Sequence, residues 1–96
     1  MKTKNQKYIL SNEKIEQFFQ DTIERNIYFR IVVLIDRDQF NFIYENNIYE
    51  ILIRVGLERH IIKKVLDSCL KNKFLVRLQK KNEITFNKNI RSYNDD

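Results

Sequence analysis

The sequence predicts a small α+β domain that is mainly helical. Apolar residues recur at spacings of three and four through most of the chain, which is typical of amphipathic helices. Two short runs near the carboxy terminus alternate apolar and polar residues, as the strands of a hairpin do. The chain has 96 residues, so it is long enough for one domain with a single modest core.

The first expected element is a helix over about 12–25. Ser11 or Asn12 offers an N-cap, and Glu13 and Glu16 lie in the first turn, where the helix dipole favours carboxylates. The apolar face of this helix is an aromatic stripe made of Ile15, Phe18, Phe19, Thr22 and Ile23.

The segment 26–43 has an ambiguous pattern. Its apolar run is rich in β-branched residues, which suggests a strand, but nothing that resembles a turn separates it from the preceding helix. We therefore interpret residues 25–35 as a second helix after a slight break at Asn26. A polar turn over 36–38 should end this helix, and residues 40–43 should add a short strand.

The centre of the chain reads as helix, turn, helix. Apolar positions over 44–55 fit a helix that Gly56, the only glycine, would end. Glycine adopts positive φ without a Cβ penalty, so it suits a tight turn between helices. A further helix over 58–72 should bury a face that contains Ile62, Leu66 and Cys69.

A β-hairpin is expected after these helices. Residues 75–79 and 84–88 alternate like strands, and the polar residues 80–83 would connect them. We expect residues 1–10 and 89–96 to be flexible, as chain ends commonly are.

Charge is distributed unevenly along the sequence. Residues 59–91 carry ten basic side chains and two carboxylates, a net charge of +8, whereas residues 9–58 have a net charge of −4. Codon bias of an AT-rich genome would account for part of a high lysine content but not for this clustering. A local excess of positive charge is the electrostatic footprint of a surface that meets phosphates. The sequence therefore predicts a small nucleic-acid-binding protein.

Few residues suit catalysis or metal binding. Cys69 and His60 are the only cysteine and histidine, so neither a disulfide framework nor a zinc site is expected. Asp36 and Asp38 are more simply read as a solvated turn than as a metal site. No Gly-rich phosphate loop and no nucleophile with a base is present. We expect no cofactor and no enzymatic activity.

No segment has the length of a membrane span. The longest apolar run, 27–35, is interrupted by Arg30 and falls short of the ~20 residues that a span needs. The basic amino terminus is not followed by the apolar region of a signal peptide. The sequence therefore predicts a cytoplasmic protein with no membrane partner.

The order helix, helix, turn, helix, β-hairpin resembles the winged helix-turn-helix family of small transcriptional regulators from bacteria, archaea and their plasmids and viruses. The resemblance covers 30–87 and is most specific within 50–76, which contains GLERHIIKKVLDSCLKNKFLV. Cys69 replaces a larger aliphatic residue of the family, and Lys73 stands where the family often has glycine. The resemblance implies a single winged-helix domain over 1–96: an amino-terminal helical region at 12–35, then the helix-turn-helix and a carboxy-terminal wing at 40–88.

The same resemblance implies how the protein would meet double-stranded DNA. Helix 58–72 would enter the major groove, and the wing tip 80–83 would lie on the backbone or in the minor groove. Arginine and lysine can donate to guanine, and aspartate can accept from cytosine. Most such contacts go to phosphate and sugar, so the base-reading residues stay undetermined. The implied DNA-binding residues are Arg59, His60, Lys63, Lys64, Asp67, Arg77, Lys80 and Lys81.

The aromatic stripe of the first helix has two possible uses. It can pack on the core of its own domain, or it can bind a second copy. Since a winged-helix core is already supplied by the later elements, our hypothesis is a two-fold homodimer that places two recognition helices about one DNA turn apart. The expected interface residues are Ile15, Phe18, Phe19, Thr22 and Ile23, with Tyr8 and part of 27–34 beside them.

Three functions follow from these expectations. The leading one is a dimeric, sequence-specific transcriptional regulator that occupies an operator. A plasmid or viral protein for DNA partition or replication would use the same chemistry. A protein-interaction adaptor is the alternative from another class, because winged helices also serve as protein-binding modules. No small-molecule ligand is evident for any of the three.

Overall fold

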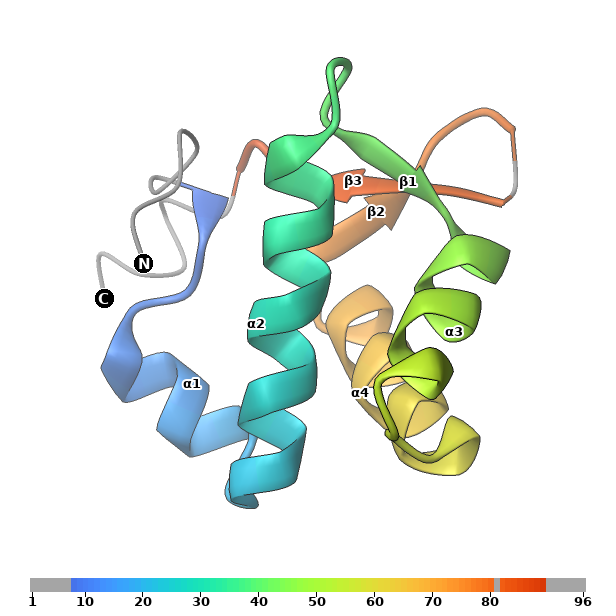
Figure 1. Ribbon diagram of the computed structural model, residues 1–96. Helices are drawn as coiled ribbons and strands as arrows, with labels where there is room; N and C mark the ends of the chain where they lie inside the picture. Colours follow the sequence, from blue (N-terminus) through green and yellow to red (C-terminus); the bar gives the residue numbers. More distant parts are fainter. Residues whose placement is uncertain (1–7, 81, 90–96) are drawn as a thin grey trace.

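The computed structural model of this protein describes residues 8–80 and 82–89, and within them the chain forms four helices and three strands. The prediction of a mainly helical α+β domain is thus confirmed. Figure 1 shows α2 near the centre, with α1 on one side of it and α3 and α4 on the other. In chain order, the elements are α1 Asn12–Phe18, α2 Thr22–Arg37, β1 Phe42–Tyr44, α3 Glu45–Arg54, α4 Arg59–Lys71, β2 Leu75–Arg77 and β3 Glu83–Phe86.

The break between the first two helices lies at 19–21, so the expected break at Asn26 is wrong. Asp21 caps α2, because its side chain accepts a hydrogen bond from the backbone N–H of Ile23 at 2.9 Å. The guanidinium of Arg25 donates to the carbonyl oxygen of Phe19 at 2.7 Å and so holds the end of α1 against the start of α2. Thr22 and Ile23 therefore belong to α2 rather than to the first helix.

The turn after α2 is stabilised by Asn41. This residue has a φ of 57°, a left-handed conformation that asparagine tolerates better than most side chains. Its amide Nδ2 donates to the carbonyl oxygens of Ile35 and Asp36, both at 3.3 Å, and thereby caps α2. Asp36 is a buried residue of the helix, which corrects its assignment to a solvated turn. The Asp38 carboxylate accepts from the backbone N–H of Phe40 at 2.8 Å.

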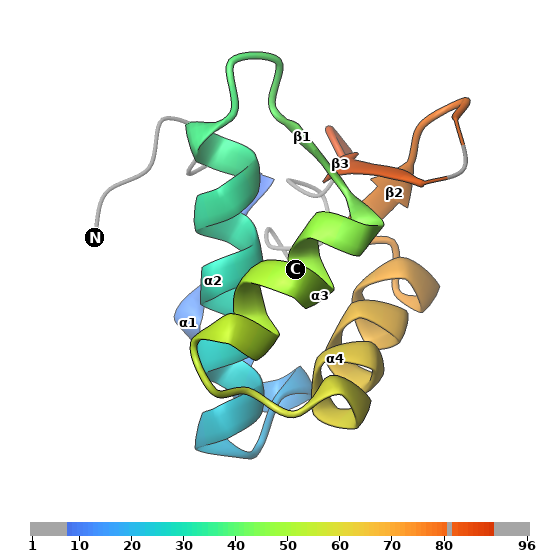
Figure 2. The ribbon, with the colours of Figure 1, turned by 45° about the vertical axis from the view of Figure 1, so that its right-hand side comes forward.

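The three strands form an antiparallel sheet in the order β1-β3-β2, so β3 is central. The strand expected over 40–43 is β1 at Phe42–Tyr44, and Glu83 begins β3 instead of lying in the hairpin connection. Both hairpin strands are shorter than expected. Figure 2 shows the sheet at one end of the molecule, with β2 and β3 extending beyond the helices.

The amino-terminal helix α1 covers the core of its own chain. Ile15 and Phe19 are buried, Phe19 stacks on Tyr28 with ring centroids 5.3 Å apart, and Phe18 packs edge-on against Phe74 at 4.9 Å. The expected dimer interface is therefore wrong for Ile15 and Phe19, which are buried inside the fold, whereas Phe18 is half-buried. Thr22 and Ile23 of the expected interface are exposed, and so is Phe29 in the adjoining segment 27–34. Burial of an aromatic side chain of this size contributes a few kcal/mol of hydrophobic free energy, about 25 cal/mol per Å² of area removed from water.

The turn between α3 and α4 agrees with the sequence prediction. Gly56 has a φ of +99°, and its backbone N–H donates to the carbonyl oxygen of Ile53 at 2.9 Å. The N–H of Leu57 donates to the carbonyl of Leu52 at 3.0 Å, so the pair forms a Schellman-type end for α3. Helix α4 then begins within a residue of its expected start.

Candidate nucleic-acid interface

Helix α4 divides into a buried face and an exposed face, as the sequence predicted. Ile62, Val65, Leu66 and Cys69 are buried against the core. Figure 2 shows α4 along one side of the molecule with the β2–β3 hairpin beyond its carboxy end. The side chains expected to contact DNA from this helix are all exposed: Arg59, His60, Lys63, Lys64 and Asp67.

Lys63 and Asp67 form an ion pair one turn apart on α4. The Lys63 Nζ lies 2.7 Å from the Asp67 Oδ2. This hydrogen bond raises the pKa of the lysine, with the charge of the carboxylate adding to the effect. Asp67, which the resemblance implies as an acceptor for cytosine, is paired with Lys63 on its own helix.

Two further cations lie close to that pair. The guanidinium of Arg59 sits over the ring of Tyr49 in α3, 4.4 Å from its centroid. Arg77 of β2 is ion-paired with Glu45, the first residue of α3. The hydrogen bond to Glu45 raises the pKa of Arg77.

These side chains form one network, which we call the α4 cluster: Arg59, Lys63, Arg77, Glu45 and Asp67. Tyr49 lies among them. Its pKa is raised, first by burial and then by the charges of Glu45 and Asp67. With three cations and two carboxylates the cluster has a formal net charge of only +1. Arg77 links the end of β2 to the start of α3 through Glu45, and Arg59 links the start of α4 to α3 through Tyr49.

Lys64 points away from the α4 cluster. Its Nζ lies 2.8 Å from the Glu24 Oε2, and this carboxylate belongs to α2, where its side chain is only 13% exposed. The hydrogen bond to Glu24 raises the pKa of Lys64. The structure thus separates Lys63 and Lys64, which the sequence analysis placed on one DNA-binding face. Lys64 ties α4 to α2.

His60 remains at the surface near the start of α4. Its Nε2 lies 3.3 Å from the Glu58 Oε2, and both side chains are largely exposed. Within the part of the chain that the structure describes, no group of three or more His, Cys, Asp or Glu side chains is arranged to hold a metal ion. Cys69 is fully buried, and this burial raises the pKa of its thiol, so the thiolate is disfavoured.

The hairpin connection is tied to the start of α3. The backbone N–H of Glu45 donates to the carbonyl of Asn82 at 2.7 Å, and the N–H of Glu83 donates to the carbonyl of Lys80 at 3.0 Å. Lys80 is exposed at this connection. Lys81, the other expected wing-tip contact, lies outside the described residues.

Two ion pairs join the acidic first half of the sequence to its basic second half. Carboxylates from the acidic first half fold onto the basic side chains of the second half: Glu24 reaches Lys64, and Glu45 reaches Arg77. Sequence analysis missed Glu24, Glu45 and Tyr49 as parts of this surface. Glu45 and Arg77 are 32 residues apart, and no local pattern links them.

Comparisons with protein-family models, with curated proteins and with solved structures find no match to this chain. A search of the described residues also finds no helix with the length and apolar character needed to cross a bilayer.

Proposed function

We propose that this chain is a winged helix-turn-helix domain that binds double-stranded DNA, with α4 in the major groove and the 78–82 connection on the backbone or in the minor groove. The observation that carries the proposal is the exposed side of α4. This helix follows α3 through the Gly56 turn, precedes a hairpin, and presents Arg59 and Lys63 to solvent. Transcriptional regulation at an operator is the role we favour.

Binding would require the α4 cluster to exchange partners. Lys63 and Arg77 are held by carboxylates of the chain itself, and DNA phosphates or guanine edges would have to replace those carboxylates. Such exposed ion pairs are weak, about 0.2–1 kcal/mol each, so a polyanion can displace them. The cation of Arg59 is already held in place over Tyr49. The proposal does not depend on a dimer, because α1 is used inside the fold.

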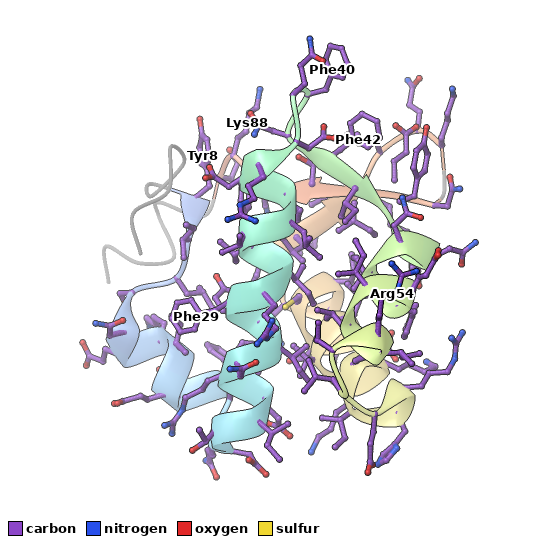
Figure 3. The ribbon with its side chains drawn as sticks, viewed as in Figure 1. Tyr8, Phe29, Phe40, Phe42, Arg54 and Lys88 are labelled. Carbon is purple, nitrogen blue, oxygen red and sulfur yellow. The ribbon has the colours of Figure 1, made fainter. Side chains whose placement is uncertain are left out.

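The test is a fluorescence-anisotropy titration with random duplex DNA and with DNA from upstream of the protein's own gene, over a series of salt concentrations. Lys63→Gln should weaken binding by roughly fivefold or more and lower the salt slope by about 1, as loss of one phosphate contact does. Lys88→Gln is the matched control, with the same change of charge. Lys88 lies beyond β3, far from Arg54 and α3 in Figure 3.

Two results would overturn the DNA proposal. One is the absence of binding at low salt, and the other is an equal effect of Lys63→Gln and Lys88→Gln.

If binding is found, its footprint distinguishes the two DNA roles. A single tight footprint indicates a regulator, whereas a footprint that spreads with protein concentration indicates a partition protein. Absence of binding would instead favour the protein-interaction adaptor, in keeping with a cluster whose charges are largely balanced.

A further inference from the structure

A second surface of the protein lies between α2 and α3, and the DNA proposal makes no use of it. It is a groove of about 470 Å³. One wall is a single face of α2, where the lining positions recur at three and four, and the other wall comes from α3. The lining residues are Asn26, Phe29, Arg30, Val33, Leu34, Arg37, Ile51 and Leu52.

The floor of the groove is apolar and partly open to water. Phe29, labelled on α2 in Figure 3, is 44% exposed, and Ile51 of α3 is 36% exposed. A single exposed apolar residue is ordinary on a protein surface. Here exposed residues from two helices line the same hollow, which is the form of a groove that receives an apolar helix face.

The charges of the groove are all of one sign. Arg30 and Arg37 are its only charged lining residues, and both are exposed. The Nε of Arg30 donates to the Asn26 Oδ1 at 2.7 Å, a neutral partner. Among the described residues Arg37 has no ion pair. Neither guanidinium group is therefore paired with a carboxylate of the described residues, and both can pair with a carboxylate of a partner.

This charge decides between possible occupants. A second copy joined face to face would bring together four guanidinium groups and no carboxylate from the lining, which like-charge repulsion disfavours. A nucleic acid would satisfy the two arginines but would leave the floor of Phe29, Val33 and Ile51 uncovered. An acidic helix with an apolar stripe satisfies both the charges and the floor.

We propose that the α2–α3 groove docks an acidic amphipathic helix of a partner protein. Its apolar stripe lies on the floor, and its carboxylates pair with Arg30 and Arg37. These arginines are seven residues apart on α2, which is about 10.5 Å along a helix axis at 1.5 Å per residue. Two acidic residues seven apart on a partner helix that runs along α2 match that spacing. The proposal holds whether or not α4 binds DNA.

The test uses two fluorescein-labelled, alanine-based peptides of about 20 residues, long enough to be helical. Both carry the same leucine stripe. One has glutamates at two flanking positions seven residues apart, and the other has lysines there. The 96-residue protein should bind the acidic peptide at least about tenfold more tightly, a difference of about 1.4 kcal/mol. Arg30→Gln with Arg37→Gln should remove this preference, because the two cations that would pair with the glutamates are lost. Both substitutions are at the surface, so the fold should be kept.

Arg54→Gln is the matched control. Arg54 is an exposed arginine of α3 that pairs with Glu50 and does not line the groove. The Arg54→Gln variant should therefore keep the preference for the acidic peptide. Equal binding of the two peptides, or of neither, overturns the proposal, as does a preference that survives in the double variant. A loss of DNA affinity in the double variant without any peptide preference assigns the groove to nucleic acid. Sedimentation that shows a dimer broken by Ile51→Glu assigns it to a second copy.

Discussion

Glu45 and Asp67 have the most direct influence on the basic surface, because they hold Arg77 and Lys63. In the proposed binding mode, a carboxylate in this position would compete with DNA in two ways. It binds the cation that a phosphate needs, and it repels the phosphate. Such residues lower affinity for any polyanion. Only a ligand whose contacts are stronger than the ion pairs it replaces then binds well. At the scale of the residue, the proposed DNA binding would depend on these two carboxylates as well as on the cations that they hold.

The first prediction concerns these two carboxylates. Glu45→Gln with Asp67→Asn should raise affinity for random duplex DNA by roughly threefold to tenfold, because two weak competing ion pairs of about 0.2–1 kcal/mol each are removed. Anisotropy at several salt concentrations measures the change. Glu50→Gln is the control, since Glu50 pairs with Arg54 outside the α4 cluster. A loss of affinity would show that the carboxylates position the cations for DNA or contact it themselves.

The second prediction concerns Tyr28, whose hydroxyl oxygen accepts a hydrogen bond from the backbone N–H of Leu10 at 3.0 Å. The site is buried, and burial raises the pKa of the phenol. Tyr28→Phe leaves that N–H without its acceptor, so it should lower the free energy of unfolding by about 1–3 kcal/mol. Urea denaturation measures this loss. Tyr44→Phe, at an exposed tyrosine, should have no such effect; equal stability of both variants would refute the account.

At the scale of the element, the ends of α3 and α4 use the same backbone geometry with different residues. Gly56 follows α3 at a φ of +99°, and Lys73 follows α4 at a φ of 61°. The N–H of Phe74 donates to the carbonyl of Cys69 at 2.8 Å, as in a Schellman-type end. Lysine at this position has a Cβ that left-handed backbone disfavours, whereas glycine has none.

The third prediction compares these two ends. Gly56→Ala should destabilise the protein by about 1–2 kcal/mol through backbone strain alone, because an added Cβ would meet no atom within 4 Å. Lys73→Gly should relieve the corresponding strain, although the more flexible unfolded chain offsets about 0.4–1 kcal/mol of the gain. Thermal unfolding should therefore move in opposite directions for the two variants. A lower midpoint for Lys73→Gly would mean that its side chain contributes more than its backbone costs.

The sequence predicted the elements that depend on local signals. Gly56 marked the end of α3, and the three-and-four spacing placed α3 and α4 to within about a residue. The break between α1 and α2 was misplaced for a physical reason. Apolar spacing continues from Ile15 through Ile23 across the break, so periodicity does not reveal it. The break is fixed by the Asp21 cap and by the bond from Arg25 to the Phe19 carbonyl.

At the scale of the whole molecule, folding brings together charges that are far apart in the sequence. Linear clustering predicted a strongly cationic face, but the α4 cluster carries a net charge of +1 because Glu45 joins it from a distant part of the chain. Pairings of this kind depend on how helices and strands are packed, which single-sequence patterns do not contain. The positions of the exposed basic residues on α4 could be predicted. The pairing of Lys64 with Glu24 of α2, and of Arg77 in β2 with Glu45 of α3, could not.

The fourth prediction concerns the role of α1 in the molecule. Phe19 is 1% exposed and Ile23 is 47% exposed, although both were expected at one dimer interface. If α1 and the Phe19 residue that follows it serve the core, Phe19→Ala should cost about 3–5 kcal/mol through lost burial and a cavity. Ile23→Ala should change stability by less than about 0.5 kcal/mol.

Urea denaturation at two protein concentrations distinguishes this role from a subunit interface. Unfolding of a protein stabilised by its own core has a midpoint that does not depend on protein concentration, while an obligate dimer becomes more stable as concentration rises. We expect a constant midpoint for the wild-type protein and for both variants. Similar losses for Phe19→Ala and Ile23→Ala, together with a midpoint that rises with concentration, would restore α1 and the start of α2 as a subunit interface. A total stability of about 5–15 kcal/mol is usual for a domain, so the loss at Phe19 would itself be a large share and readily measured.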